Sequence, residues 1–265
     1  QEIMVDPVIA ADGISYERKE ITQRLASKNT SPKTNLPLEH KALISNLTLK
    51  QQIDELMASG EVDDDLGADY ADRKYKTSPE YAQELFDEGK VEEAAELGHA
   101  EAQGKMADRY YFGSDGVTKD LEKCVEWAKK AAAGGDEYGQ ARLGCAYYVG
   151  EGGLEKDYAM ALKWYEKAAE QGCAAPMNNI GVLYEHGGHG VTKNLVTAVS
   201  WYRKAAEAGN AQGQQNLGNC YYKGKGATKN LMVARSWLQK SANQDHVDAI
   251  RKLGTMMVKG EGGAN

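Results

Sequence analysis

Residues 143–153, LGCAYYVGEGG, and residues 161–169, ALKWYEKAA, are the part of the sequence that decides its fold. The pattern returns about every 37 residues, and a tryptophan marks each copy: Trp127, Trp164, Trp201 and Trp237. An aliphatic residue followed by glycine keeps the same spacing at Leu143-Gly144, Ile180-Gly181, Leu217-Gly218 and Leu253-Gly254. This many positions in register indicate a tandem repeat.

Each repeat is predicted to contain two helices and a glycine-rich loop. Leu143 and Tyr147 fall on one face of the first helix, and the second helix shows a stripe of Ala161, Trp164, Tyr165 and Ala168. Glycines are expected to adopt the left-handed conformation at helix ends and in loops, namely at Gly135, Gly172 and Gly209 and at Gly116, Gly153, Gly190 and Gly226. A unit this small cannot bury its apolar face alone, so the units should stack into an α-solenoid of helical hairpins.

The repeats set the domain organisation. They are predicted to span residues 98–134, 135–171, 172–208 and 209–244, with a partial fifth repeat at 245–265 and an atypical leading hairpin at 78–97. Because the sequence stops inside a loop, more repeats are expected to follow. Residues 57–77 are acidic and are expected to form a solvated linker, with recruitment of a basic partner as the less favoured alternative.

The composition excludes several classes of protein. The sequence has 29 glycines without a period of three, which excludes collagen, and no apolar run long enough to span a membrane. A net charge of −7 argues against a nucleic-acid or anionic-membrane partner. Four cysteines are too few for a disulfide framework, which favours a reducing compartment: the cytoplasm, with the nucleus as the alternative. Residue 1 is Gln rather than Met, so a truncated N-terminus is expected, and any targeting signal would lie outside this sequence.

Residues 1–56 lack the repeat and are predicted to form a small α+β domain. A β-rich run over residues 3–9 leads to a turn at Asp12-Gly13, and Tyr16 is predicted to open a helix. A last helix is expected around residues 47–56. Domains of this size often need a disulfide or a structural metal ion for stability. This segment contains no Cys and only one His, His40, which excludes a structural zinc site.

Both parts resemble known families. The Leu-Gly, Gly-x-x-Gly, Ala-x-x-Trp-Tyr and Lys-Ala-Ala elements of residues 98–265 resemble the Sel-one-like repeats, relatives of tetratricopeptide repeats. Residues 4–8 (MVDPV), 12–18 (DGISYER), 31–34 (SPKT) and 43–50 (LISNLTLK) resemble the U-box, the zinc-free relative of the RING domain of ubiquitin ligases. In a U-box a polar network replaces the zinc ions, and the candidates for it here are Asp12, Ser15, Glu17, Arg18, Ser31, Thr34 and Asn46. Ordinary turn and capping roles are the alternative for each of them.

The U-box resemblance implies a ubiquitin-protein ligase without a covalent catalytic residue, cofactor or metal. Such a domain docks a ubiquitin-conjugating enzyme and positions its ubiquitin thioester for transfer. The residues that the resemblance places on the docking surface are Gln1, Ile3, Arg24, Pro32, Asn35 and Leu36. The alternative is a non-catalytic scaffold, because Arg24 stands where many members carry Trp and Asn35 where many carry a basic residue.

The repeats are expected to hold a protein substrate or adaptor. The candidate partner-binding positions vary between repeats while their neighbours stay fixed: Lys105, Arg142, Asn179, Asn216 and Lys252. The residues one turn further on vary in the same way: Asp108, Cys145, Val182, Asn219 and Thr255. An unconstrained solvent face would look the same, so both interpretations stay open. If the face binds, its Lys and Arg favour a peptide with acidic groups.

Other candidate sites are less favoured. His186 and His189 lack a third ligand at a fixed spacing, so a metal site is not expected there. Gly224-Lys225-Gly226 lacks the Ser or Thr of a phosphate-binding loop. Cys145 and Cys220 are expected to be small core residues.

Overall fold

The computed structural model describes residues 7–9, 15–17, 44–45, 53–54 and 71–263. The chain divides into two compact units, Gln1–Ala82 and Gln83–Asn265, which are described separately.

The first unit contains a small antiparallel sheet in the order β2-β1-β3. Its strands are β1 (Pro7–Ile9), β2 (Ser15–Glu17) and β3 (Ile44–Ser45). The predicted β-rich run pairs with β2 in antiparallel fashion, with Val8 opposite Tyr16, so the predicted helix start at Tyr16 is wrong because Ser15–Glu17 is a strand. The ladder to β1 binds the backbone of this segment and holds it extended. The remainder of that predicted helix lies outside the described residues. A strand as short as β3 leaves no alternating pattern to detect in the sequence.

A helical segment at residues 71–75 occupies the end of the predicted linker. Within the first unit the Lys74 Nζ lies 2.6 Å from the Asp54 carboxylate, which ties this segment to residues 53–54. The linker prediction for residues 57–70 lies outside the described residues.

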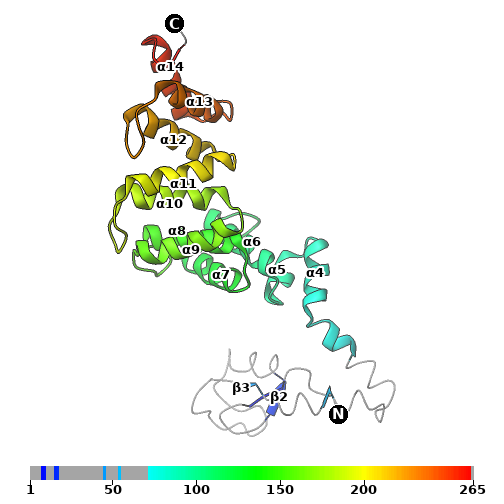
Figure 1. Cartoon of the computed structure of the whole chain (residues 1–265). Helices are drawn as coiled ribbons and strands as arrows, with labels where there is room; N and C mark the ends of the chain where they lie inside the picture. Colours follow the sequence, from blue (N-terminus) through cyan, green and yellow to red (C-terminus); the bar gives the residue numbers. More distant parts are fainter. Residues whose placement is uncertain (1–6, 10–14, 18–43, 46–52, 55–70, 264–265) are drawn as a thin grey trace. The chain divides into compact units, whose positions relative to one another are not determined.

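The second unit is a solenoid of helical hairpins, as predicted (Figure 1). Two short helices lead into it, α4 (Pro79–Asp87) and α5 (Val91–Glu96). The repeat helices are α6 (Ala100–Phe112), α7 (Leu121–Ala133), α8 (Glu137–Val149), α9 (Tyr158–Glu170), α10 (Ala174–His186), α11 (Leu195–Glu207), α12 (Ala211–Lys223), α13 (Leu231–Ala242) and α14 (Val247–Val258). Helices α6, α8, α10, α12 and α14 are called the first helices below, and the surface that carries positions 105, 142, 179, 216 and 252 is called the first-helix face.

Polar caps fix where the second helix of each repeat begins. Asp120, Asp157, Asn194 and Asn230 each accept a hydrogen bond from the backbone N–H three residues later, at 2.9–3.1 Å. Such caps satisfy backbone donors that a helix start leaves free. The first helix α8 ends at Gly150, whose φ of +80° and close approach to the Lys156 backbone both require glycine.

The glycine after the aliphatic residue is required by packing within a hairpin. A Cβ at Gly144 would lie 2.6 Å from the Tyr165 ring, and one at Gly181 would lie 2.5 Å from Tyr202. Both tyrosines are almost completely buried. Because this one position of the first helix carries no side chain, a large side chain of the second helix can enter the core.

Each repeat tryptophan is half-buried and covered by a lysine of its own helix. The Lys Nζ lies 3.9–4.4 Å from the Trp ring centroid in all four repeats, in the pairs Lys130–Trp127, Lys167–Trp164, Lys204–Trp201 and Lys240–Trp237. The fixed lysine of the Lys-Ala-Ala motif thus has a role in the fold, as a cation over an aromatic face.

Candidate functional site

The residues predicted to dock a conjugating enzyme lie outside the described residues: Gln1, Ile3, Arg24, Pro32, Asn35 and Leu36. The same holds for most of the predicted polar network: Asp12, Arg18, Ser31, Thr34 and Asn46. The structure gives only the backbone of the remaining two, Ser15 and Glu17, which are the end residues of β2. These assignments stay predictions.

The five candidate positions of the repeats lie one on each first helix, and the cations among them already have partners in the chain. Lys105 forms an ion pair with Glu101 at 3.4 Å and lies over the Phe86 ring at 4.1 Å. Lys252 lies 3.5 Å from the centroid of the Tyr222 ring. These contacts weaken the expectation that the face attracts an acidic peptide.

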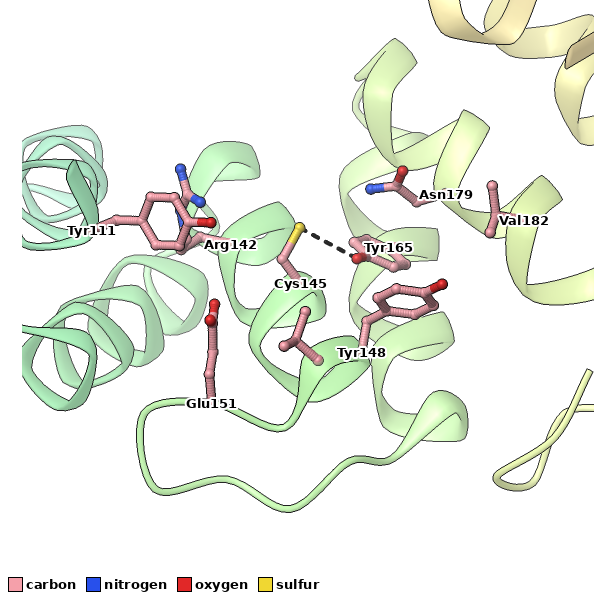
Figure 2. A pocket seen from close by; sticks show the side chains of 9 residues that line it. Tyr111, Arg142, Cys145, Tyr148, Glu151, Tyr165, Asn179 and Val182 are labelled. Carbon is pink, nitrogen blue, oxygen red and sulfur yellow. Dashed lines mark hydrogen bonds between the residues drawn. The ribbon is translucent and has the colours of Figure 1, made fainter. Parts of the chain in front are cut away.

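A cavity of about 340 Å³ opens on the first-helix face around α8 and α10 (Figure 2). It brings together two of the five candidate positions, Arg142 and Asn179, but not Lys105, Asn216 or Lys252. Two of the variable positions one turn further on, Cys145 and Val182, also line it. The residues that line it are Tyr111, Arg142, Cys145, Tyr148, Val149, Glu151, Tyr165, Asn179 and Val182. The walls are mainly apolar and aromatic, with a few polar groups, which is the usual character of a binding pocket.

Arg142 is held at the edge of this pocket by Asp108. Its Nε and one terminal nitrogen donate to the same Asp108 carboxylate oxygen at 3.1 and 2.5 Å. The guanidinium also lies 4.0 Å from the centroid of the Tyr111 ring. Burial disfavours the charged form, but the hydrogen bond and charge of Asp108 outweigh it, so the pKa of Arg142 is raised above its ordinary value.

Two polar side chains that line the pocket are bound to each other. The Tyr165 hydroxyl donates to the Cys145 Sγ at 3.3 Å, as Figure 2 shows. Burial raises the pKa of Tyr165 well above its ordinary range, so the hydroxyl stays protonated. Beside the pocket, Asn216 donates to Asn178 at 2.9 Å, which links α12 to α10.

Glu151 lies on the rim, directly after Gly150 at the end of α8, and its position shows in Figure 2 below Arg142. Among the described residues it has no ion-pair partner. Glu185, one turn after Val182 on α10, accepts a hydrogen bond from the Tyr202 hydroxyl at 2.7 Å but forms no ion pair within residues 71–263 either. The carboxylates at and beside the pocket therefore lack the compensating cation that Arg142 provides for Asp108.

Sequence reasoning missed several lining residues and predicted another only in part. Tyr111, Tyr148, Val149 and Glu151 were not predicted, because none of them belongs to the motifs that mark the repeat or to the variable positions considered on the first helices. The prediction of a core position is confirmed for Cys220, whose buried thiol has a pKa raised to about 11 by desolvation. It holds only in part for Cys145, which packs against the core but is half-buried because the pocket opens beside its thiol.

The described part of the chain shows neither a metal-binding cluster nor a membrane-spanning helix. In that part, no three His, Cys, Asp or Glu residues gather closely enough to hold a metal ion. None of its helices has both the length and the apolar character needed to cross a membrane.

Comparison with known families covers both units. A model of the U-box domain matches residues 1–61. The model of the Sel1 repeat matches four segments that together make up more than half of the chain: 100–136, 137–173, 177–210 and 211–246.

The similar curated proteins match at the U-box. The WD repeat, SAM and U-box domain-containing protein 1 of Danio rerio is 59% identical over 54 residues, which are 20% of this chain and 11% of that protein. The U-box domain-containing protein 52 of Arabidopsis thaliana is 51% identical over 53 residues, or 20% of this chain and 6% of that protein. The chain thus spans only a small part of these relatives.

The similar solved structures match at the repeats. A Sel1 repeat protein from Oxalobacter formigenes is 31% identical with a TM-score of 0.59, over 69% of this chain and 75% of that one. The protective antigen c5321 of uropathogenic Escherichia coli, described as an SLR fold, is 38% identical with a TM-score of 0.59, over 66% of this chain and 37% of that one. The chain belongs to the Sel1 repeat family, and a U-box domain precedes its repeats.

Proposed function

We propose that this chain is a ubiquitin-protein ligase of the U-box type, whose repeats hold a protein substrate or an adaptor. The observation that carries the proposal is the match of residues 1–61 to the U-box domain, with 59% identity to one relative over 54 residues. Sequence identity this high over a whole small domain supports the same docking role. The chemistry would be positioning: the conjugating enzyme supplies the thioester, and the ligase holds it in a reactive geometry.

Pro32 and Leu36 would contribute the apolar part of the docking surface, with Gln1, Ile3, Arg24 and Asn35 around it. Arg24 can lay its aliphatic stem on the partner while its guanidinium stays in water. Asn35 can donate a hydrogen bond, but without a charge to strengthen it.

The solenoid would supply the second binding surface. Sel1 repeats in other proteins imply protein interactions, and the pocket around α8 and α10 offers a preformed place for a side chain of a partner. Stacked repeats present such positions at regular intervals along one face, which suits an extended protein segment.

Autoubiquitination with a panel of conjugating enzymes tests the proposal. The intact chain should form ubiquitin conjugates with at least one enzyme, and Pro32→Ala should reduce their formation at least about tenfold, as loss of a docking contact at the centre of an interface would. No conjugates with any enzyme would overturn the ligase assignment.

The second candidate is a non-catalytic scaffold, favoured by Arg24 and Asn35 at positions where many U-boxes carry other residues. It predicts partner binding through the repeats and no conjugates in the same assay. The two candidates therefore give opposite results in one experiment.

A further inference from the structure

The charges around the pocket on the first-helix face are unevenly compensated. The one lining cation, Arg142, donates hydrogen bonds from two of its nitrogens to Asp108, and its guanidinium lies over the Tyr111 ring. Glu151 lines the same pocket and pairs with no described cation. Glu185, which lies one turn after the lining residue Val182 on α10, is a second carboxylate that pairs with no described cation. The local balance is thus negative where an occupant would sit.

An anionic side chain fits this site poorly. Two nitrogens of the one lining guanidinium are already bound to Asp108, and an incoming anion would meet the Glu151 carboxylate in the pocket lining. A purely apolar side chain also fits poorly, because it would take water away from the Glu151 carboxylate without replacing the lost hydrogen bonds.

The remaining walls suit the stem of a long side chain. Tyr148 stacks on Tyr158 with ring centroids 5.0 Å apart, so its position is fixed. Val149 is 53% exposed and Val182 is half-buried, and both line the pocket. Lys and Arg combine an apolar stem with a charged end, and they commonly bury the first while the second finds a carboxylate or water.

We propose that this pocket binds a lysine or arginine side chain of the partner protein, with its stem against Tyr148, Val149 and Val182 and its charged end at Glu151. The inference rests on the proposed partner-holding role of the repeats and names the chemistry of the segment they hold. It reverses the sign expected from the sequence, because the cations of this face are bound within the chain.

A peptide selection tests the preference without assuming the partner. Random peptides of about twelve residues displayed on phage are panned on the intact chain, a length that spans several repeats when extended. The enriched peptides should share Lys or Arg at one aligned position. Enrichment of Asp or Glu there, enrichment of uncharged residues only, or no enrichment would overturn the inference.

A double-mutant cycle then places the basic residue at Glu151. The enriched peptide carries a fluorophore, and its Kd is measured by anisotropy with the intact chain and with Glu151→Gln, which keeps the size of the side chain and removes its charge. We expect binding about tenfold weaker, which is the usual value of a charge-assisted hydrogen bond. Replacing the peptide's basic residue by norleucine should have a similar effect, and the two changes together should weaken binding no more than either alone.

The matched control is Glu155→Gln, because Glu155 lies in the same loop but is exposed and does not line the pocket. It should change the Kd by less than about twofold, as surface charges away from a contact do. An equal effect of both Gln variants, or additive effects in the cycle, would refute the placement at Glu151. Since the measurement involves no ubiquitin, an inactive U-box would leave its result unchanged.

Discussion

Replacing Gly144 by Ala should destabilise the repeat solenoid, although alanine favours helices. The propensity term alone would stabilise a helix by about 1 kcal/mol. The added methyl group, however, would lie 2.6 and 2.7 Å from two ring atoms of Tyr165, which is fully buried and cannot move aside without displacing α9 from α8. Overpacking of this kind costs about 1–3 kcal/mol, so we expect a net loss of about 1 kcal/mol.

Gly254→Ala is the matched control for this substitution. Gly254 stands at the equivalent position of α14, directly after Leu253, and a Cβ there would meet nothing within 4 Å. Its substitution should therefore show the propensity term alone and stabilise by up to about 1 kcal/mol. The two chemically identical changes are expected to have opposite signs.

Urea unfolding, monitored by tryptophan fluorescence, measures both effects on stability. Because repeat arrays depart from two-state behaviour, the unfolding midpoints are compared between variants whose free energy of unfolding has the same dependence on urea concentration. A third variant isolates the contact: with Tyr165→Ala present, adding Gly144→Ala should stabilise instead of destabilise. If Gly144→Ala stabilises the parent chain as much as Gly254→Ala does, the close contact with Tyr165 does not limit packing and the argument fails.

Three further predictions follow from other parts of the chain. Asp157→Ala removes the cap of α9 and should cost about 1 kcal/mol of unfolding free energy, whereas Asp157→Asn should cost much less. Burial raises the pKa of the Cys124 and Cys220 thiols to about 11, so at about pH 8 a thiol reagent should label Cys145 long before either of them. The free energy of unfolding should also fall as the pH rises from about 9 to 11, because these two thiols ionise at lower pH in the unfolded chain than in the folded one. Equal labelling rates would contradict the burial. Asn35→Arg should increase conjugate formation several-fold if the U-box docks productively, and no increase in the conjugation assay would count against that docking mode.

The solenoid could be predicted from the sequence because its positions are fixed by local packing. Gly144 must be small for Tyr165 to enter the core, and Gly150 must adopt a positive φ, so both recur wherever the geometry recurs. Strand β2 was mistaken for a helix start because its pairing partner, β1, decides its conformation.

The candidate pocket could be predicted only in part. The variable positions pointed to Arg142 and Asn179, and one turn further on to Cys145 and Val182, but a variable position does not reveal whether its charge is free. That depends on contacts between repeats, such as the one from Arg142 to Asp108, which are separated by 34 residues in the sequence. A spacing pattern contains no information on such a pair.

The position of Glu151 explains why a specific site arises in this repeat and not in the others. The residue after the glycine that ends the first helix, or after its equivalent, is Ser114 in the first repeat, Glu151 in the second, and Gly188, Lys225 and Glu261 in the following ones. Ser114 carries no charge, Gly188 has no side chain to contribute and Lys225 has the opposite charge, while Glu261 already accepts a hydrogen bond from the Tyr222 hydroxyl at 2.9 Å. Among these five positions, only Glu151 therefore presents a carboxylate that no side chain of the described chain binds. The loops, whose side chains the helical packing does not constrain, are thus where this solenoid can acquire specificity for a partner without loss of its fold.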